Sequence, residues 1–389
     1  MHRVGRSVVA VCAVASLLVA GVGVSPVSGK TVNGCVIKAK TKCVKADLKG
    51  AKLKGANLAG ANLTNANLTG ANLTNANLTG ANLSIAGMLR ANLTGANLSG
   101  AKLKGANLKG ANLDSANLAG VNLRDADLSD ADSSFANLAG VNLKGANLAG
   151  VSLAYANLTG VSSGGITGTP GELPVGWELI NGYLVGPGAE LFRVDLTGVD
   201  LSFANLIQTD FSSSNLTGAN LTGANLLQAD LGYVNLTGAD LTGAILLQAD
   251  LGYVNLTGAN LTGANLTGAD LLDVNLTGAN LTGADLSGVV SAFITGTPVA
   301  LPDGWKLIKG ALVGPGANLA QNDLSGVNLS GVDLTNAFLN GAFLNGADLT
   351  GANLTNAILT GAILTNAILT GVTWSNTTCP DGSVTNTGC

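Results

Sequence analysis

The sequence predicts an all-β solenoid, and three observations support this fold class. A five-residue phrase, Ala-Asn/Asp-Leu-X-Gly, recurs from Ala46 almost to Val372. Its Leu position, called the centre below, and the small residue two positions earlier point to the same side of an extended backbone. A period of five matches neither the helical nor the coiled-coil period. Each unit is therefore expected to bury its inner face only against neighbouring units.

The segment 1–29 is typical of a secretory signal. Arg3 and Arg6 precede an apolar run from Val8 to Val24 that has small residues near its end. A retained membrane anchor is the alternative. No second candidate span follows, so we expect no transmembrane segment in the mature chain. This segment predicts a secreted or extracellular protein, including one associated with a cell envelope.

The cysteines of the mature chain flank the repeats in two pairs. Cys35 and Cys43 lie in an N-terminal segment, 30–45, whereas Cys379 and Cys389 lie in a C-terminal segment, 374–389. An even set at the ends of an exported chain predicts two disulfides. These would close caps over strand edges that otherwise invite aggregation. A zinc site is the alternative, but the only histidine is His2, in the signal.

The repeats form three blocks, 46–163, 191–291 and 319–373. Their centres run from Leu48 to Leu158, from Leu191 to Leu286 and from Leu319 to Leu369, which gives 54 units. A stretch that begins at Leu226 and ends at Tyr233 recurs from Leu246 to Tyr253, four units later. This recurrence indicates a coil of four pentapeptides, whose copies stack about 4.8 Å apart.

Units such as Ala61-Asn62-Leu63-Thr64-Asn65 and Ala239-Asp240-Leu241-Thr242-Gly243 follow one consensus. In these units the chain resembles the pentapeptide-repeat family, and the resemblance covers most of the mature sequence. It implies a right-handed quadrilateral β-helix with about four pentapeptides per coil. Both the centre and the small residue would then lie inside.

Two related segments separate the blocks, and we call 164–190 insertion 1 and 292–318 insertion 2. Trp177 and Trp305 occupy equivalent places in them. The two insertions are equally long, and each exceeds one coil by the same short excursion. Asn181-Gly182 and, more weakly, Lys309-Gly310 predict a tight hairpin. The insertions are either decorations whose Trp covers the coil or loops that bind a partner.

Surface residues one coil apart should form rows along the solenoid. One row carries Asp210, Asp230, Asp250 and Asp270, which are weak candidates for a calcium-type site because hard cations prefer oxygen ligands. Asp also simply alternates with Asn in this repeat, so no metal and no cofactor is expected. Rows of Gln, Tyr and Thr run nearby, and the Thr rows allow an ice-binding alternative by analogy of fold.

Charge is distributed unevenly along the chain. Residues 30–163 hold 14 basic and 6 acidic residues, whereas 164–389 hold 3 and 17. Such a basic part could attract anionic envelope polymers or lipid headgroups. Alternatively, lysines keep an open solenoid end from pairing. The candidate contact residues are Lys38, Lys40, Lys42 and Lys45 near the N-terminus, and a row formed by Lys104, Arg124 and Lys144.

Apolar residues replace Asn or Asp at outward positions of the last coils. They are Phe338, Phe343, Ile358, Ile363 and Ile368, and we call them the apolar strip. Contiguous exposed apolar side chains usually indicate a contact. Either the tail from Trp374 to Cys389 covers the strip, or another chain does, for example in a homodimer.

The sequence argues against an enzyme. The mature chain has no histidine, its cysteines are expected to pair, and its carboxylates are scattered over a rod without a concavity where catalytic groups converge. Some members of the resembled family mimic DNA and act on gyrase, but the export signal and the basic first block disfavour that alternative. We therefore expect a non-enzymatic scaffold, a rod of about 15 coils and roughly 75 Å, that contacts an unknown protein or an anionic polymer and no nucleic acid. A secreted binder of cations, glycans or ice is the alternative.

Overall fold

A strict register of four pentapeptides organises the chain. The computed structural model describes residues 29–389, so the predicted signal lies outside the described residues. Outward residues pair in parallel with those one coil later, for example Asn62 with Asn82 and Asn235 with Asn255. Four pentapeptides therefore make one coil, and the all-β solenoid expected from the repeat is confirmed.

Backbone hydrogen bonds join each unit to the next coil. In the unit around Leu48, the N–H of Leu48 donates to Asn67 (2.7 Å) and that of Gly50 to Thr69 (2.9 Å). The N–H of Ala51 closes the corner by donating to the Leu48 carbonyl. Gly50 has a φ of 63°, a left-handed conformation that glycine adopts without a Cβ clash. The repeat thus encodes a short extended segment and a corner.

The core is a narrow column of Leu and Ala. Leu63, Leu68 and their small partners Ala61 and Ala66 are almost fully buried, and the same pattern holds along each block. The core forms three clusters rather than one. The first ends at Leu184, the second begins at Val185, and the third begins at Ala311. The insertions therefore divide the core.

Regular strands are few because most units pair through single bridges, and no helix occurs in residues 29–389. The strands are β1 (Thr31–Val32), β2 (Cys35–Val36), β3 (Glu178–Ile180), β4 (Tyr183–Val185), β5 (Asp270–Leu272), β6 (Val290–Ala292), β7 (Lys306–Ile308), β8 (Ala311–Val313), β9 (Thr377–Thr378) and β10 (Val384–Thr385). β5 and β6 pair in parallel across one coil, whereas the other four pairs are antiparallel.

Each insertion is a coil that carries a hairpin. Ser162 pairs with Glu190 and Val290 with Asn318, so the register resumes after an interval of the same length in both cases. In insertion 1, β3 and β4 pair with Ile180 opposite Tyr183, around Asn181 and Gly182. In insertion 2, β7 and β8 form the corresponding hairpin. The hairpins expected from the Asn-Gly and Lys-Gly turns are confirmed.

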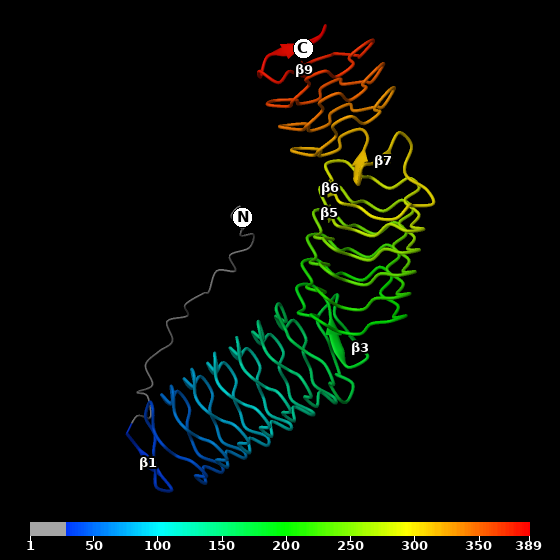
Figure 1. Cartoon of the computed structure of the whole chain (residues 1–389). Helices are drawn as coiled ribbons and strands as arrows, with labels where there is room; N and C mark the ends of the chain where they lie inside the picture. Colours follow the sequence, from blue (N-terminus) through cyan, green and yellow to red (C-terminus); the bar gives the residue numbers. More distant parts are fainter. Residues whose placement is uncertain (1–28) are drawn as a thin grey trace.

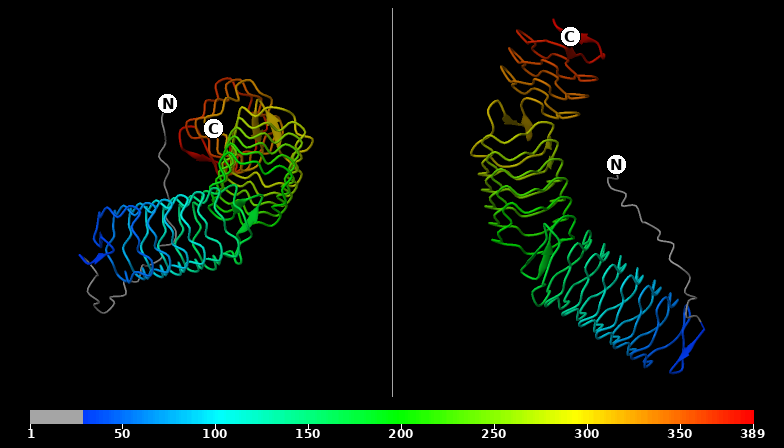
Figure 2. Two further views of the ribbon diagram at one scale, coloured as in Figure 1. Left: turned by 90° about the horizontal axis from the view of Figure 1, so that it is seen from below. Right: turned by 180° about the vertical axis from the view of Figure 1, so that it is seen from behind.

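The molecule is a bent rod. Its first block forms one arm, the chain turns at the hairpin of insertion 1, and a further change of direction occurs at insertion 2 (Figures 1 and 2). The regular repeat alone does not predict these changes of direction. The bends coincide with the breaks between the three core clusters, because the stack of identical coils is interrupted there.

Disulfides close both ends of the described chain. Cys35 bonds to Cys43 beside the β1–β2 hairpin, and Cys379 bonds to Cys389 beside the β9–β10 hairpin. Thr378 continues the solenoid by pairing with Ile358. Within residues 29–389, no helix is long and apolar enough to cross a membrane.

Candidate interaction surfaces

One line of outward positions runs along the whole described solenoid, and we call it the long row. Successive parallel bridges carry it from Lys42 through Lys102 and Ser162, across insertion 1 to Glu190. It then passes through the four Asp residues and across insertion 2 to the apolar strip. Its later members are Asp210, Asp230, Asp250, Asp270, Val290, Asn318, Phe338, Ile358 and Thr378.

The basic part of the long row is well exposed. Lys102 is exposed, and so are Lys104, Arg124 and Lys144, which follow the row on adjacent coils. The backbone joins them, since Gly105 donates to Arg124 and Asp125 donates to Lys144, both at 2.9 Å. Arg124 also donates to its neighbour Asp125 at 3.4 Å. These cations therefore form the expected row, with coil spacing.

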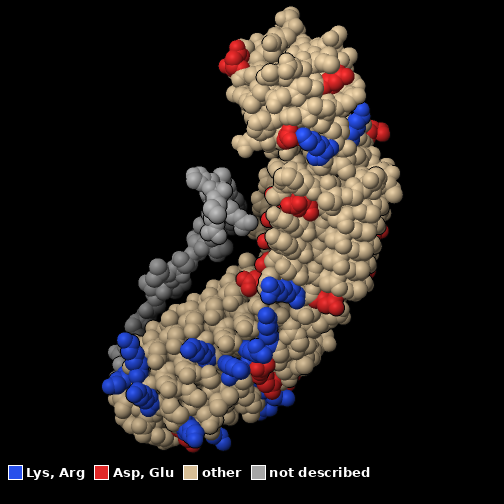
Figure 3. All heavy atoms as spheres, viewed as in Figure 1, with Lys and Arg blue, Asp and Glu red and all other residues tan. Residues whose placement is uncertain are grey.

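The N-terminal lysines extend the basic surface to the end of the rod. Lys38, Lys40, Lys42 and Lys45 are all exposed. The first three lie in the loop that the Cys35–Cys43 disulfide closes, and Lys45 follows it. Figure 3 shows most of the blue side chains on the first arm, whereas red ones are scattered mainly over the rest of the rod. The imbalance of 14 basic against 6 acidic residues is thus present on the surface.

The four Asp residues stack as expected, but they act first as local caps. Each accepts the backbone N–H two positions further along, as Asp210 does from Ser212 (2.8 Å) and Asp270 from Leu272 (3.0 Å). Burial raises the pKa of Asp270; the Leu272 N–H opposes this rise and the Asp250 charge adds to it. Across residues 29–389, no three His, Cys, Asp or Glu side chains gather as a group that could hold a metal ion.

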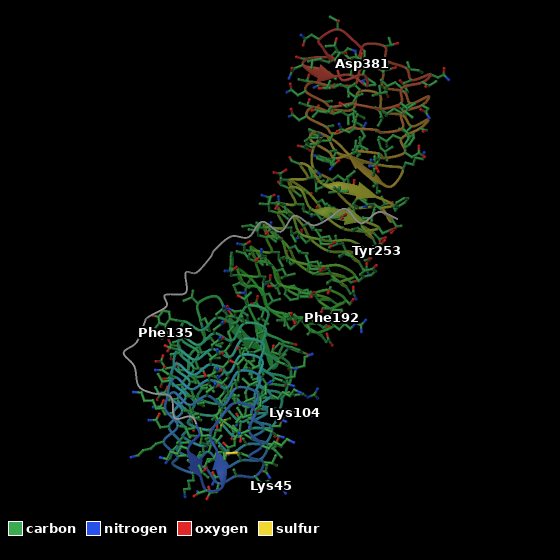
Figure 4. All side chains as sticks on the ribbon, turned by 90° about the vertical axis from the view of Figure 1, so that its left-hand side faces the viewer. Lys45, Lys104, Phe135, Phe192, Tyr253 and Asp381 are labelled. Carbon is green, nitrogen blue, oxygen red and sulfur yellow. A yellow bond between two sulfur atoms is a disulfide. The ribbon has the colours of Figure 1, made fainter. Side chains whose placement is uncertain are left out.

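In the neighbouring Gln and Tyr rows, each side chain contacts the next member of its own row. Gln208 donates to Gln228, and Gln228 to Gln248, at 3.1 and 3.0 Å. Tyr233 and Tyr253 stack with ring centroids 4.6 Å apart. Figure 4 shows Lys104, Phe192 and Tyr253 along one side of the molecule, with Phe135 on the other.

The Thr hydroxyls of the ice-binding alternative also have local partners. Thr217, for example, donates to Asn215 at 2.6 Å, and Thr262 donates to Asn260 at the same distance. These hydroxyl groups brace the corners of the repeat.

The apolar strip is exposed. Phe338, Phe343, Ile363 and Ile368 retain 41–49% of their accessible surface, whereas Ile358 is partly buried. The tail pairs Thr378 with Ile358 and thereby extends the end of the rod. The tail therefore leaves most of the strip exposed.

Trp177 and Trp305 join adjacent cores. Trp177 packs against both the first and the second cluster, and Trp305 against both the second and the third. Each ring lies over a glycine, Gly186 or Gly314, where a Cβ would overlap the indole. Both side chains are partly buried, so each indole contributes to the packing between two core clusters.

The sequence alone did not place Lys102, the four Asp residues and the strip residues Phe338 and Ile358 on one line; Phe343, Ile363 and Ile368 lie on other rows. Counting along the sequence in steps of one coil within each block leaves these residues on separate rows. A longer step across each insertion, which includes its excursion, connects Ser162 to Glu190 and Val290 to Asn318. The sequence contains this longer spacing, but it predicts the long row only if one already knows that the chain rejoins the same row after each insertion.

One protein-family model matches most of the repeat blocks. The family model described as pentapeptide repeats matches eight segments: 46–84, 91–130, 126–162, 189–226, 219–258, 255–290, 315–351 and 339–371. No curated protein matches the chain significantly.

Three solved structures that resemble the chain are themselves described as pentapeptide repeat proteins. The first is HetL of the cyanobacterium Nostoc sp. strain PCC 7120, involved in heterocyst differentiation regulation; it is 26% identical over 73% of this chain and 91% of its own, with a TM-score of 0.23. A protein of the Arabidopsis thaliana thylakoid lumen is 44% identical over 26% of this chain and 70% of its own, with a TM-score of 0.26. Rfr23 of the cyanobacterium Cyanothece 51142 is 30% identical over 29% of this chain and 88% of its own, with a TM-score of 0.25.

Proposed function

Because the chain belongs to the pentapeptide-repeat family, whose fold is a right-handed quadrilateral β-helix, we propose that it is an exported, non-enzymatic interaction scaffold. Its first block binds an anionic polymer or lipid surface of the cell envelope, and its apolar strip binds a protein. The single observation that carries this proposal is the division of charge, with a basic first arm and an acidic remainder.

Exposure and spacing support the envelope contact. The basic side chains protrude from successive coils and are largely free of carboxylate partners. In the described part of the chain, the first block contains only two ion pairs, Lys109–Asp130 at 3.7 Å and Arg124–Asp125 at 3.4 Å, both exposed. Such pairs contribute little and leave the net charge positive. Several cations on a rigid rod bind a polyanion or anionic lipids additively, at about 1 kcal/mol each near a membrane surface.

The local hydrogen bonds of the polar side chains support a non-enzymatic character. The carboxylates of the Asp row and the Thr hydroxyls accept or donate within their own corners. Their regular placement braces the repeat. This arrangement suits a scaffold, whose binding groups are spread along a surface rather than gathered around a reacting atom.

Co-sedimentation with envelopes of the source organism tests the proposal. The oxidised protein without the segment 1–29 is expected to pellet at low salt and to stay in the supernatant at high salt, because salt screens exposed charges. A Lys104→Glu/Lys144→Glu variant should bind at least about tenfold more weakly. Lys306→Glu/Lys309→Glu, in the acidic part, is the matched control and should bind normally. Absence of binding at low salt would contradict the envelope contact.

A further inference from the structure

Insertion 2 forms a cavity that the scaffold role does not use. Its volume is about 690 Å³, and it lies between the 297–301 loop, the β7 side of the hairpin and the next coil at Asn328 and Ser330. The volume is within the usual range for small-molecule sites. Trp305, Leu301, Leu307 and Ile308 line it and are only partly buried. Apolar side chains thus remain exposed around a hollow.

The two insertions are related in sequence, so insertion 1 provides an internal comparison. Three of the positions that line the cavity differ in charge from their counterparts in insertion 1 and its following coil. Glu172, Glu178 and Asp200 of the first insertion and its following coil correspond to Ala300, Lys306 and Asn328 of the second. The apolar frame is retained, since Pro170, Leu173 and Trp177 correspond to Pro298, Leu301 and Trp305. Insertion 2 therefore has a methyl group, a cation and an amide where insertion 1 has three carboxylates.

The polar groups of the cavity are suited to an anion. Lys306 is the only charged residue that lines it, and within residues 29–389 Lys306 is in no ion pair. Its neighbour Lys309 is different, because it is paired with Asp323 at 2.7 Å. The oxygen of the Asn328 amide accepts from the N–H and hydroxyl of Ser330, at 2.8 and 2.6 Å. The amide NH2 of Asn328 has no acceptor in the described chain and is available as a donor.

We propose that this cavity binds a small organic anion with an apolar body, such as an aromatic or alicyclic carboxylate or sulfonate. Lys306 and the Asn328 amide bind the anionic group, while Trp305, Leu301 and Leu307 contact the apolar body. The equivalent region of insertion 1 rejects such a ligand, because Glu172, Glu178 and Asp200 place negative charge there.

Fluorescence titration of the oxidised protein with 8-anilinonaphthalene-1-sulfonate, an aromatic sulfonate, tests the proposal. The neutral analogue N-phenyl-1-naphthylamine reports on the apolar contacts alone. Lys306→Glu should weaken sulfonate binding about tenfold and change binding of the neutral probe by less than about twofold. Val299→Gly, which copies Gly171 at an exposed position, should weaken both probes by about threefold.

Two control variants locate the bound probe. Lys104→Glu makes the same charge reversal far from the cavity and should leave both titrations unchanged. Phe343→Asn alters the apolar strip, the other exposed apolar surface, and should also have no effect. The proposal is overturned if the sulfonate does not bind, if Lys306→Glu leaves its affinity unchanged, or if Phe343→Asn rather than Lys306→Glu abolishes binding. Circular dichroism confirms that each variant is folded.

Discussion

At the scale of single residues, Ser133 is the clearest exception to the repeat. It occupies a centre position, where almost every other unit has Leu, and it is fully buried. Its hydroxyl has no hydrogen-bond partner among the described residues. A buried hydroxyl without a partner costs about 1–3 kcal/mol, and a Ser leaves less apolar volume in the column than a Leu.

Replacement of this residue should therefore stabilise the protein. Ser133→Leu restores the consensus, and we expect the free energy of unfolding to rise by about 2 kcal/mol. Ser133→Ala removes only the hydroxyl and should give about half of that gain. Equilibrium denaturation in urea measures both. A lower stability of Ser133→Leu would show that the site has closed around the smaller side chain.

Asp270 links stability to pH. Burial and the neighbouring Asp250 raise its pKa in the folded protein. The folded state then binds a proton more tightly than the unfolded state, so this residue lowers stability as pH rises from the unfolded pKa through the raised pKa. Asp270→Asn should raise the melting temperature at about pH 7, with a gain of a few tenths of a kcal/mol. The gain should disappear near pH 3.

Asp348 is the matched control because its pKa moves in the opposite direction. The hydroxyl of Thr350, followed by the Thr350 N–H, lowers the pKa of this exposed carboxyl. The stability that Asp348 contributes to the folded state is present above the unfolded pKa and is lost as pH falls through the folded pKa. Asp348→Asn should therefore not stabilise the protein at neutral pH. An equal gain from both substitutions would show that Asp270 has no special environment.

At the scale of elements, the insertions depend on a close fit between an indole and a glycine. Gly314 lies beneath Trp305 and does not have a left-handed φ, so only the ring excludes a Cβ. Gly314→Ala should destabilise the protein by about 1–3 kcal/mol through overpacking. Gly87→Ala is the control, since a Cβ at that position meets nothing within 4 Å. Thermal unfolding compares the two; equal melting temperatures would contradict the packing role of Trp305.

Much of the element structure follows from the sequence. The coil of four pentapeptides, the hairpin at Asn181-Gly182 and the two disulfides were all predictable, because each depends on local turn chemistry, on the recurrence of units or on cysteine spacing. Unlike these features, the cavity of insertion 2 depends on how the hairpin packs against Asn328 one coil later. Such tertiary placement is not contained in the five-residue period.

At the scale of the whole molecule, the bend and the long row were not predicted. A regular repeat specifies the contacts between coils but not the angle at an insertion, where Trp177 packs against two core clusters. The sequence could not show that the apolar strip is exposed, because it also allowed the tail to cover the strip. The charge division, in contrast, could be read directly from the sequence.

The exposed strip predicts a concentration-dependent association if its partner is a second copy. Phe338→Asn/Phe343→Asn restores the polar type of the repeat at two outward positions that are exposed in the single chain. Light scattering should show a dimer for the natural sequence and a monomer for the variant. A monomeric mass for both would remove the homodimer and leave a different protein as the partner.

Lysine footprinting on envelopes tests the central claim most directly, because it shows which arm makes the contact. The oxidised protein is acetylated with and without bound envelopes, and the modified lysines are identified by mass spectrometry. The account predicts protection of Lys38, Lys40, Lys42, Lys45, Lys104 and Lys144, with unchanged reactivity of Lys306. Protection of Lys306 with free reactivity of the first-block lysines would contradict it.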